Sequence, residues 1–172
     1  MFVAAGAHVC LKGYDVLIRA FARLADKSVR LIIFGDGPET DNYRKLIAEL
    51  GVADRVSLPG YVENLPAEIK AADSFVVSSQ SESFSIVLVE ALAASTPVVS
   101  TNCPLGPPEI LQNGKYGIMC AAGDPNSLAD ALQWVLDGQA IVPPRESWEK
   151  YTIENVMDKY ECAIRRVMEE NK

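Results

Sequence analysis

The chain has 172 residues, of which 49% are hydrophobic and 23% are charged, a composition that fits one globular domain with a sizeable core. Its net charge of −7 argues against a nucleic-acid-binding protein, whose surface is normally basic. The sequence contains neither a run of about 18 apolar residues that can cross a membrane nor the basic start and long apolar run of an export signal. We therefore expect a cytoplasmic α/β domain with no nucleic-acid partner.

Six short apolar runs rich in β-branched residues alternate with segments of helical period. The strands are predicted at 2–5, 29–34, 55–58, 74–78, 98–101 and 117–120. The helices between and after them are predicted at 12–25, 40–50, 65–72, 84–94, 107–112 and 127–136. This alternation is typical of a parallel sheet with crossover helices, so the sequence predicts a doubly wound, Rossmann-like α/β fold with about six strands.

The tail beyond Pro143 and Pro144 has a different pattern. Its large apolar residues are spaced like one face of a long amphipathic helix, which we place at 145–170. They are Trp148, Tyr151, Val156, Tyr160, Ile164 and Val167. Something has to cover such a face.

The four cysteines, Cys10, Cys103, Cys120 and Cys162, are far apart and form no C-x2-C pair. His8 is the single histidine, so the sequence argues against a zinc site. The pattern favours buried free thiols in a reducing compartment.

Glu82 and Glu90 bracket the point where a predicted strand gives way to a helix. The N-terminus of a helix attracts anions, because its first N–H groups have no acceptor within the helix and the helix dipole is positive there. A ligand with phosphate at this position can meet a carboxylate on each side, which matches the chemistry of a sugar nucleotide. For each acid the alternative is structural: Glu82 can complement the dipole, and Glu90 can be a solvated surface residue.

Lys12 stands at the start of a predicted helix, where a cation opposes the helix dipole, so a diphosphate is its expected partner. His8 can donate to phosphate when protonated, but its position beside a strand favours a packed histidine at least as strongly. The loops at Gly35, Gly37 and 60–62 follow strands, and ligands bind open α/β sheets at the carboxyl ends of strands. These loops and the 82–85 loop should therefore meet at one crevice, although tight turns without ligand contact explain the glycines equally well.

Seven segments, taken in order, resemble motifs of the group 1 (family 4) retaining glycosyltransferases of GT-B fold. They are KGYDxLIxAF from residue 12, LxIxGxGP from 31, PGYV from 59, ADSFV from 72, ESFSIVLVEALA from 82 with TPVV from 96, GPPEIL from 106, and Gly117-Ile118 with Gly123-Asp124-Pro125. The resemblance covers the whole chain, 1–172, but corresponds to the donor-binding, C-terminal half of such an enzyme. It implies a longer protein with an N-terminal acceptor-binding domain, against which the 145–170 helix packs.

The resemblance also implies roles for the candidate residues. Lys12 and Glu82 are the implied catalytic residues: Lys12 neutralises the diphosphate and Glu82 orients the sugar, while Glu90 holds the ribose. The other implied donor-binding residues are Gly6, Gly35, Gly37, Tyr61, Val62, Ser83, Phe84, Ser85, Ile86 and Val87. Serine is a good N-cap, and the N–H groups of residues 85–87 can face phosphate.

One departure concerns the diphosphate: the arginine that follows Gly6 in the family is Ala7 here. Relatives also often carry glycine at the positions of Ser83 and Ser85. The implied function is transfer of a hexose-type sugar from a UDP- or GDP-sugar to a glycan or lipid-linked acceptor, without a metal or other cofactor. Peripheral association with the cytoplasmic membrane face, through the missing half, is compatible with this. The alternatives are another GT-B enzyme, such as a sugar-nucleotide epimerase, and a non-catalytic nucleotide-binding module.

Overall fold

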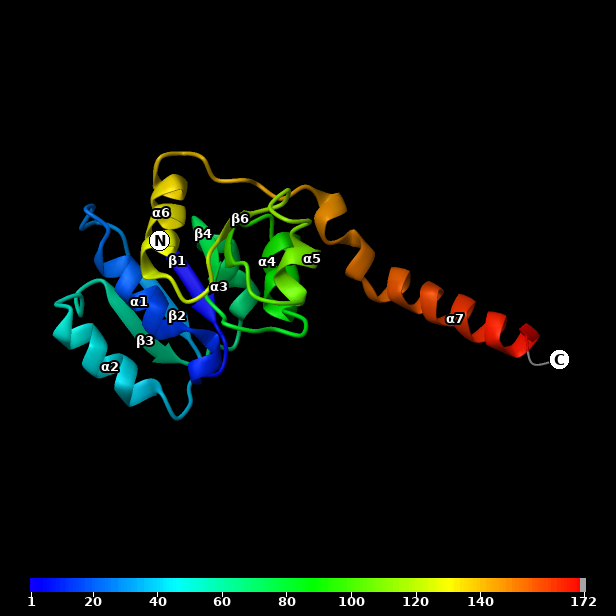
Figure 1. The fold of residues 1–172 in the computed structure, drawn as a ribbon, viewed down its shortest axis with the longest axis horizontal. Coiled ribbons are helices and arrows are strands. Elements are labelled where there is room, and N and C mark those ends of the chain that lie inside the picture. The colour runs from blue at the N-terminus through cyan, green and yellow to red at the C-terminus, as the bar shows by residue number, and fades with distance from the viewer. Residues whose placement is uncertain (171–172) are drawn as a thin grey trace.

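Six parallel strands form the centre of the structure, a computed structural model that describes residues 1–170 (Figure 1). The strands are β1 (Phe2–Ala5), β2 (Leu31–Phe34), β3 (Val56–Gly60), β4 (Ser74–Val77), β5 (Val98–Thr101) and β6 (Ile118–Cys120). Their order in the sheet is β3-β2-β1-β4-β5-β6, so the chain starts in the middle, winds to one edge and then to the other. The predicted doubly wound α/β fold is confirmed, and each strand lies within two residues of its predicted bounds.

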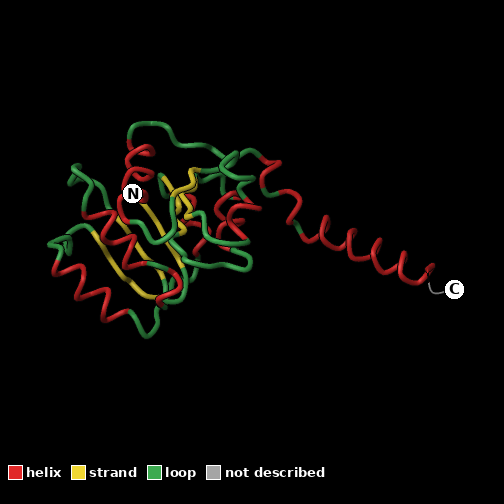
Figure 2. Tube along the Cα trace, viewed as in Figure 1, coloured by secondary structure: helices red, strands yellow, loops and turns green. Residues whose placement is uncertain are grey.

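Helices cover both faces of this sheet, as Figure 2 shows. They are α1 (Tyr14–Ala22), α2 (Thr40–Glu49), α3 (Leu65–Ala71), α4 (Ile86–Ala93), α5 (Gly106–Ile110) and α6 (Pro125–Leu136). Helices α1, α2 and α6 pack on one face, and α3, α4 and α5 pack on the other. In β1, Phe2 and Ala4 belong to the first core and Val3 and Ala5 to the second, because successive strand residues point to opposite faces.

The prediction of one continuous helix over 145–170 is wrong for its first part. This part forms two 3-10 turns, η2 (Arg145–Ser147) and η3 (Glu149–Tyr151), and α7 (Ile153–Glu170) begins only after Thr152, whose backbone is extended. Trp148 and Tyr151 pack against the core beneath α4, which holds this part of the chain against the domain. Helix α7 then extends away from the sheet (Figure 1). The large apolar side chains along it are exposed, among them Tyr160, Ile164 and Val167.

The cysteines are split between core and surface. Cys103 and Cys120 are buried as predicted, whereas Cys10 and Cys162 are exposed, so the prediction of buried thiols is wrong for these two. Cys10 lies in the short 3-10 turn η1 (Cys10–Lys12), and Cys162 lies on α7. Among the described helices, none combines the length and apolar character needed to cross a membrane.

Candidate functional site

Two contacts with Ser78 hold the backbone at Lys12 and Gly13 beside the carboxyl end of β4. Ser78 Oγ donates a hydrogen bond of 2.8 Å to the Lys12 carbonyl. The next residue, Gly13, has a φ of +62°, and a Cβ there would lie 2.3 Å from the Ser78 carbonyl oxygen. Only glycine fits this close approach. The turn before α1 is therefore tied to the end of a strand that lies 66 residues later in the chain.

The Lys12 ammonium group forms an ion pair with Glu82. Its Nζ lies 2.6 Å from Glu82 Oε1, and the two side chains are 25% and 11% exposed. Ser79 Oγ donates to the same oxygen at 2.8 Å. The structure thus brings Lys12 and Glu82, the two residues with implied catalytic roles, into direct contact. The Lys12 ammonium group and the Ser79 hydroxyl both bind the same oxygen of the Glu82 carboxylate.

A cavity of about 10 Å³ lies beside this ion pair, room for one water-sized group. Its lining residues come from β1, η1, α1, the end of β4 and the start of α4: Ala5, Lys12, Tyr14, Val76, Val77, Ser78, Ser79, Glu82, Ser85 and Val87. Burial raises the pKa of Tyr14, with Tyr43 and Glu82 adding to the effect, so the Tyr14 hydroxyl stays protonated. It can donate a hydrogen bond to an oxygen in this cavity.

A second cavity, of about 190 Å³, lies on the other side of Ala5 and Val87, which line both. Its remaining lining residues are Gly6, Ala7, Phe34, Gly35, Tyr61, Val62 and Leu65. A Cβ on Gly35 would lie 2.0 Å from the Gly6 carbonyl oxygen, so the loops after β1 and β2 meet in backbone contact here. Both cavities lie at the carboxyl ends of the strands, the edge at which ligands bind open α/β sheets, and we refer to the two together as the crevice.

Gly37 lies outside both cavities and has a structural explanation. A Cβ there would lie 2.6 Å from the His8 carbonyl oxygen, so glycine is needed for the β2–α2 loop to pack on the loop after β1. For Gly37 the tight-turn alternative is therefore sufficient.

Packing accounts for the position of His8, although among the described residues its buried Nε2 has no hydrogen-bond partner. It is fully buried, and edge contacts join its ring to Tyr14 and Tyr43. Its Nδ1 lies 2.8 Å from Thr40 Oγ1, which itself donates to Asp36, so His8 carries its proton on Nδ1. Burial lowers the pKa of His8, although Asp36 opposes this, so the ring is neutral at pH 7. It cannot supply a positive charge to a phosphate at that pH.

Phe84, Ile86 and Glu90 line a third, largely apolar cavity of about 440 Å³. It lies between α4 and the segment that contains Trp148 and Tyr151, and Phe84 packs edge-on against Tyr151 with ring centroids 5.4 Å apart. Glu90 follows Ile86 by one turn and Val87 by three residues, so it lies on the face of α4 between this cavity and the crevice. Glu90 is half-buried, and it lines this third cavity but neither cavity of the crevice. The remaining loop residue, Ser83, is exposed.

Ser85 occupies the N-cap position of α4, which begins two residues later than the predicted helix, but its side chain does not cap the helix. Among the described residues, no backbone N–H bonds to its side chain, and its hydroxyl is buried without a hydrogen-bond partner. The expectation that its side chain caps the helix is therefore wrong. The Ser85 carbonyl accepts the N–H groups of Leu88 and Val89. The N–H groups of Ile86 and Val87, which come before them, have no acceptor within the helix.

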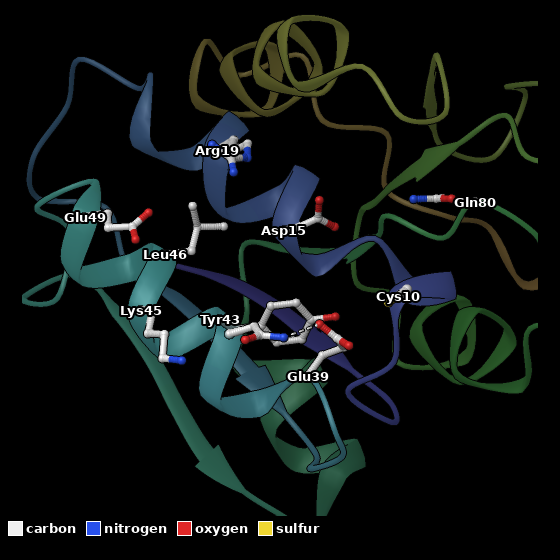
Figure 3. A pocket seen from close by; sticks show the side chains of 10 residues that line it. Cys10, Asp15, Arg19, Glu39, Tyr43, Lys45, Leu46, Glu49 and Gln80 are labelled. Carbon is white, nitrogen blue, oxygen red and sulfur yellow. Dashed lines mark hydrogen bonds between the residues drawn. The ribbon is translucent and has the colours of Figure 1, made fainter.

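A further pocket, of about 360 Å³, lies between α1 and α2 (Figure 3). Its charged lining residues are Asp15, Arg19, Glu39, Lys45 and Glu49, and their charges largely balance. Cys10 is at its rim, and a hydrogen bond with the Glu39 carboxylate raises the pKa of the Cys10 thiol. None of the residues predicted for the site lines this pocket.

Three polar residues of the crevice were not predicted as site residues: Tyr14, Ser78 and Ser79. Tyr14 stands two residues after Lys12 in a motif that was identified, and Ser78 and Ser79 directly follow a predicted strand. Ligands bind open α/β sheets at the carboxyl ends of the strands, so examining the residues after every predicted strand would have selected both serines.

Comparisons with known proteins identify relatives of this chain. Residues 1–155 match the family model described as "Glycosyl transferases group 1". Among curated relatives, the lipopolysaccharide core biosynthesis glycosyltransferase LpsE of Rhizobium meliloti is 39% identical over 131 residues, which are 76% of this chain and 38% of the relative. The N-acetyl-alpha-D-glucosaminyl L-malate synthase of Bacillus anthracis is 31% identical over 169 residues, 94% of this chain and 44% of the relative.

A solved structure of a mutant S. aureus TarM, in complex with Fondaparinux, alpha-GlcNAc-glycerol and UDP, superposes with a TM-score of 0.81. The two sequences are 26% identical, and the match covers 92% of this chain and 34% of TarM. The chain thus spans less than half the length of each of these three proteins. On the match of the family model over residues 1–155, the chain belongs to the group 1 glycosyl transferases.

Proposed function

We propose that this chain is the nucleotide-sugar-binding half of a retaining glycosyltransferase. The observation that carries the proposal is the crevice at the carboxyl ends of the strands, where the Lys12–Glu82 ion pair and the start of α4 lie side by side. An ammonium group and free N–H groups stabilise a diphosphate, whose negative charge grows as the sugar leaves. The Glu82 carboxylate is available to hydroxyl groups of the sugar.

The larger cavity is proposed to take the nucleoside. Its walls are mostly apolar, with the Tyr61 side chain at the rim, as suits a flat base. Glu90, on the adjoining face of α4, is proposed to bind the ribose hydroxyls after a change of rotamer toward the crevice. UDP is favoured over GDP as the nucleotide, because UDP is present in the related TarM complex.

In the proposed reaction, the bond between the sugar and the diphosphate breaks and the nucleoside diphosphate leaves. A hydroxyl oxygen of a glycan or lipid-linked acceptor bonds to the sugar and gives up its proton. The acceptor is proposed to bind an N-terminal domain of the same enzyme. Since closure of two domains normally assembles such a site, this half alone is expected to bind the donor and transfer little.

A second function, a nucleotide-binding module without catalysis, is favoured by one observation. Ala7 supplies no cation to the crevice, and the Lys12 charge is already balanced by Glu82. Such a module would bind the nucleotide but stay inactive even when joined to its acceptor domain.

Ligand-observed NMR titration with UDP, GDP, ADP and CMP tests the binding proposal. We expect saturable binding of UDP that weakens in Glu90→Ala and is unchanged in Glu154→Ala, a control on the exposed side of α7. Transfer assays on the full-length enzyme then separate catalysis from binding alone. If none of the four nucleotides binds at millimolar concentration, the proposal is wrong.

A further inference from the structure

The Ser85 hydroxyl stands out as an unexplained buried polar group. The residue is 3% exposed, and among the residues that the structure describes its Oγ has no hydrogen-bond partner. Burying a hydroxyl without a partner is unfavourable, because the group loses its hydrogen bonds to water. Such a group in a native protein calls for an explanation.

The usual explanation for serine at this position fails. An N-cap serine normally accepts a hydrogen bond from an N–H group in the first turn of its helix. Ser85 has the extended backbone of an N-cap residue, with φ −101° and ψ 94°, but no such bond to its side chain is present in the described part of the chain. The hydroxyl is therefore free to serve a group outside the helix.

The surroundings of Ser85 indicate what that group is. Ser85 lines the small cavity together with Lys12 and Glu82, at the start of the eight-residue helix α4. The cavity has room for about one water-sized group, and a phosphate oxygen is of this size. The ammonium group and the helix start both favour a negatively charged oxygen at this point.

We infer that the Ser85 hydroxyl donates a hydrogen bond to a phosphate oxygen of the nucleoside diphosphate, which makes it a binding residue that acts through its side chain. This inference rests on the proposed function and goes beyond it, because relatives with glycine here can offer only backbone N–H groups. The side chain supplies one further donor to the diphosphate. This hydrogen bond offsets part of the binding free energy that is lost because Ala7 supplies no cation.

Calorimetric titration of the chain with UDP and with uridine tests this inference. Because a hydrogen bond to a charged group is involved, Ser85→Ala and Ser85→Gly should each weaken UDP binding about ten- to a hundredfold. Uridine binding should not change, since uridine has no phosphate. Ser81→Ala, in the same loop but outside both cavities, is the matched control and should bind UDP normally.

Thermal unfolding without ligand supplies a second readout that a structural serine would not give. Removing an unpartnered buried hydroxyl should leave the melting temperature of Ser85→Ala unchanged or raise it, whereas loss of a helix cap would lower it. The inference is overturned if Ser85→Ala binds UDP as tightly as the wild type does. It is also overturned if the substitution weakens the binding of UDP and of uridine to the same extent. If the wild type binds neither compound, the proposed function fails as well.

Discussion

Lys12 Nζ lies 2.6 Å from Glu82 Oε1, so an ion pair joins the turn before α1 to the loop before α4 across the carboxyl edge of the sheet. Ser79 donates to the same carboxylate oxygen. Because Glu82 already balances the Lys12 charge, an incoming diphosphate has to compete with Glu82 for the ammonium group. The pair therefore determines how much positive charge the unliganded crevice presents.

Glu82→Gln tests this competition. The amide keeps a hydrogen-bond acceptor for Ser79 but removes the counter-charge, so the partly buried Lys12 loses stabilisation and the free energy of unfolding should fall by about 1–3 kcal/mol. The freed ammonium group should at the same time bind UDP several-fold more tightly. Urea unfolding and calorimetry measure the two effects, with the exposed Glu154→Gln as control. Weaker UDP binding in Glu82→Gln would contradict the competition.

Ala7→Arg should restore the cation that the resemblance leads one to expect. Ala7 is exposed and lines the larger cavity, so an arginine side chain can enter the crevice without displacing the core. One charged hydrogen bond to the diphosphate should tighten UDP binding by about tenfold or more. Ala7→Gln has a similar length without the charge and serves as control. Equal affinities of the two variants would show that the diphosphate does not approach this residue.

The sequence predicted the strands well because most of them are buried on both faces and have the pattern of short apolar runs between turn residues. The exception is the edge strand β3, in which Ser57 and Pro59 are exposed. The tail was harder for a physical reason. Trp148 and Tyr151 continue the apolar period of α7, but both pack against the core beneath α4. Trp148 lies between the two 3-10 turns, and Tyr151 ends the second. Such a packing contact overrides local helical preference and cannot be read from spacing.

The sequence selects candidate site residues one by one, but it does not show how they are arranged. Lys12 and Glu82 were each selected by their helix starts, yet their ion pair depends on the close approach of Gly13 to Ser78, which joins distant parts of the chain. The resemblance likewise identified Ser85 as a donor-binding residue, but through its backbone N–H group. Only the structure shows that its hydroxyl is buried with no partner among the described residues.

Gly35→Ala should be far more destabilising than Gly51→Ala. Both glycines have positive φ, +118° and +66°, so alanine is strained at either position. At Gly51 the new Cβ meets no atom within 4 Å, and we expect a loss of about 1–2 kcal/mol. At Gly35 it would lie 2.0 Å from the Gly6 carbonyl oxygen, so the loops after β1 and β2 must also separate.

Urea unfolding compares the two glycine variants directly. We expect the midpoint for Gly35→Ala to fall well below that for Gly51→Ala, and its UDP binding to weaken because the two loops form one wall of the crevice. Similar midpoints would mean that the loops adapt easily and that their backbone contact contributes little to the site.

His8, the single histidine of the sequence, should make the stability of the domain depend on pH just below neutrality. Burial lowers its pKa in the folded state from the ordinary 6.5, with Asp36 opposing the shift and Arg44 reinforcing it. The unfolded chain therefore binds a proton at a higher pH than the folded chain does. As the pH falls below about 6.5 towards the folded-state pKa, the free energy of unfolding should decrease, by at most about 1.4 kcal/mol per pH unit for one proton.

Urea unfolding at several pH values between 7.5 and 5.0 measures this dependence, above the range near 4 in which the carboxyl groups begin to titrate. His8→Asn is the informative variant, because its amide can still donate to Thr40 Oγ1, the acceptor of the His8 Nδ1 proton, but does not titrate. We expect the variant to be less stable at pH 7.5 and to show a flatter pH profile than the wild type. Parallel profiles would assign the dependence to other groups, and His8 would then be protonated equally in both states.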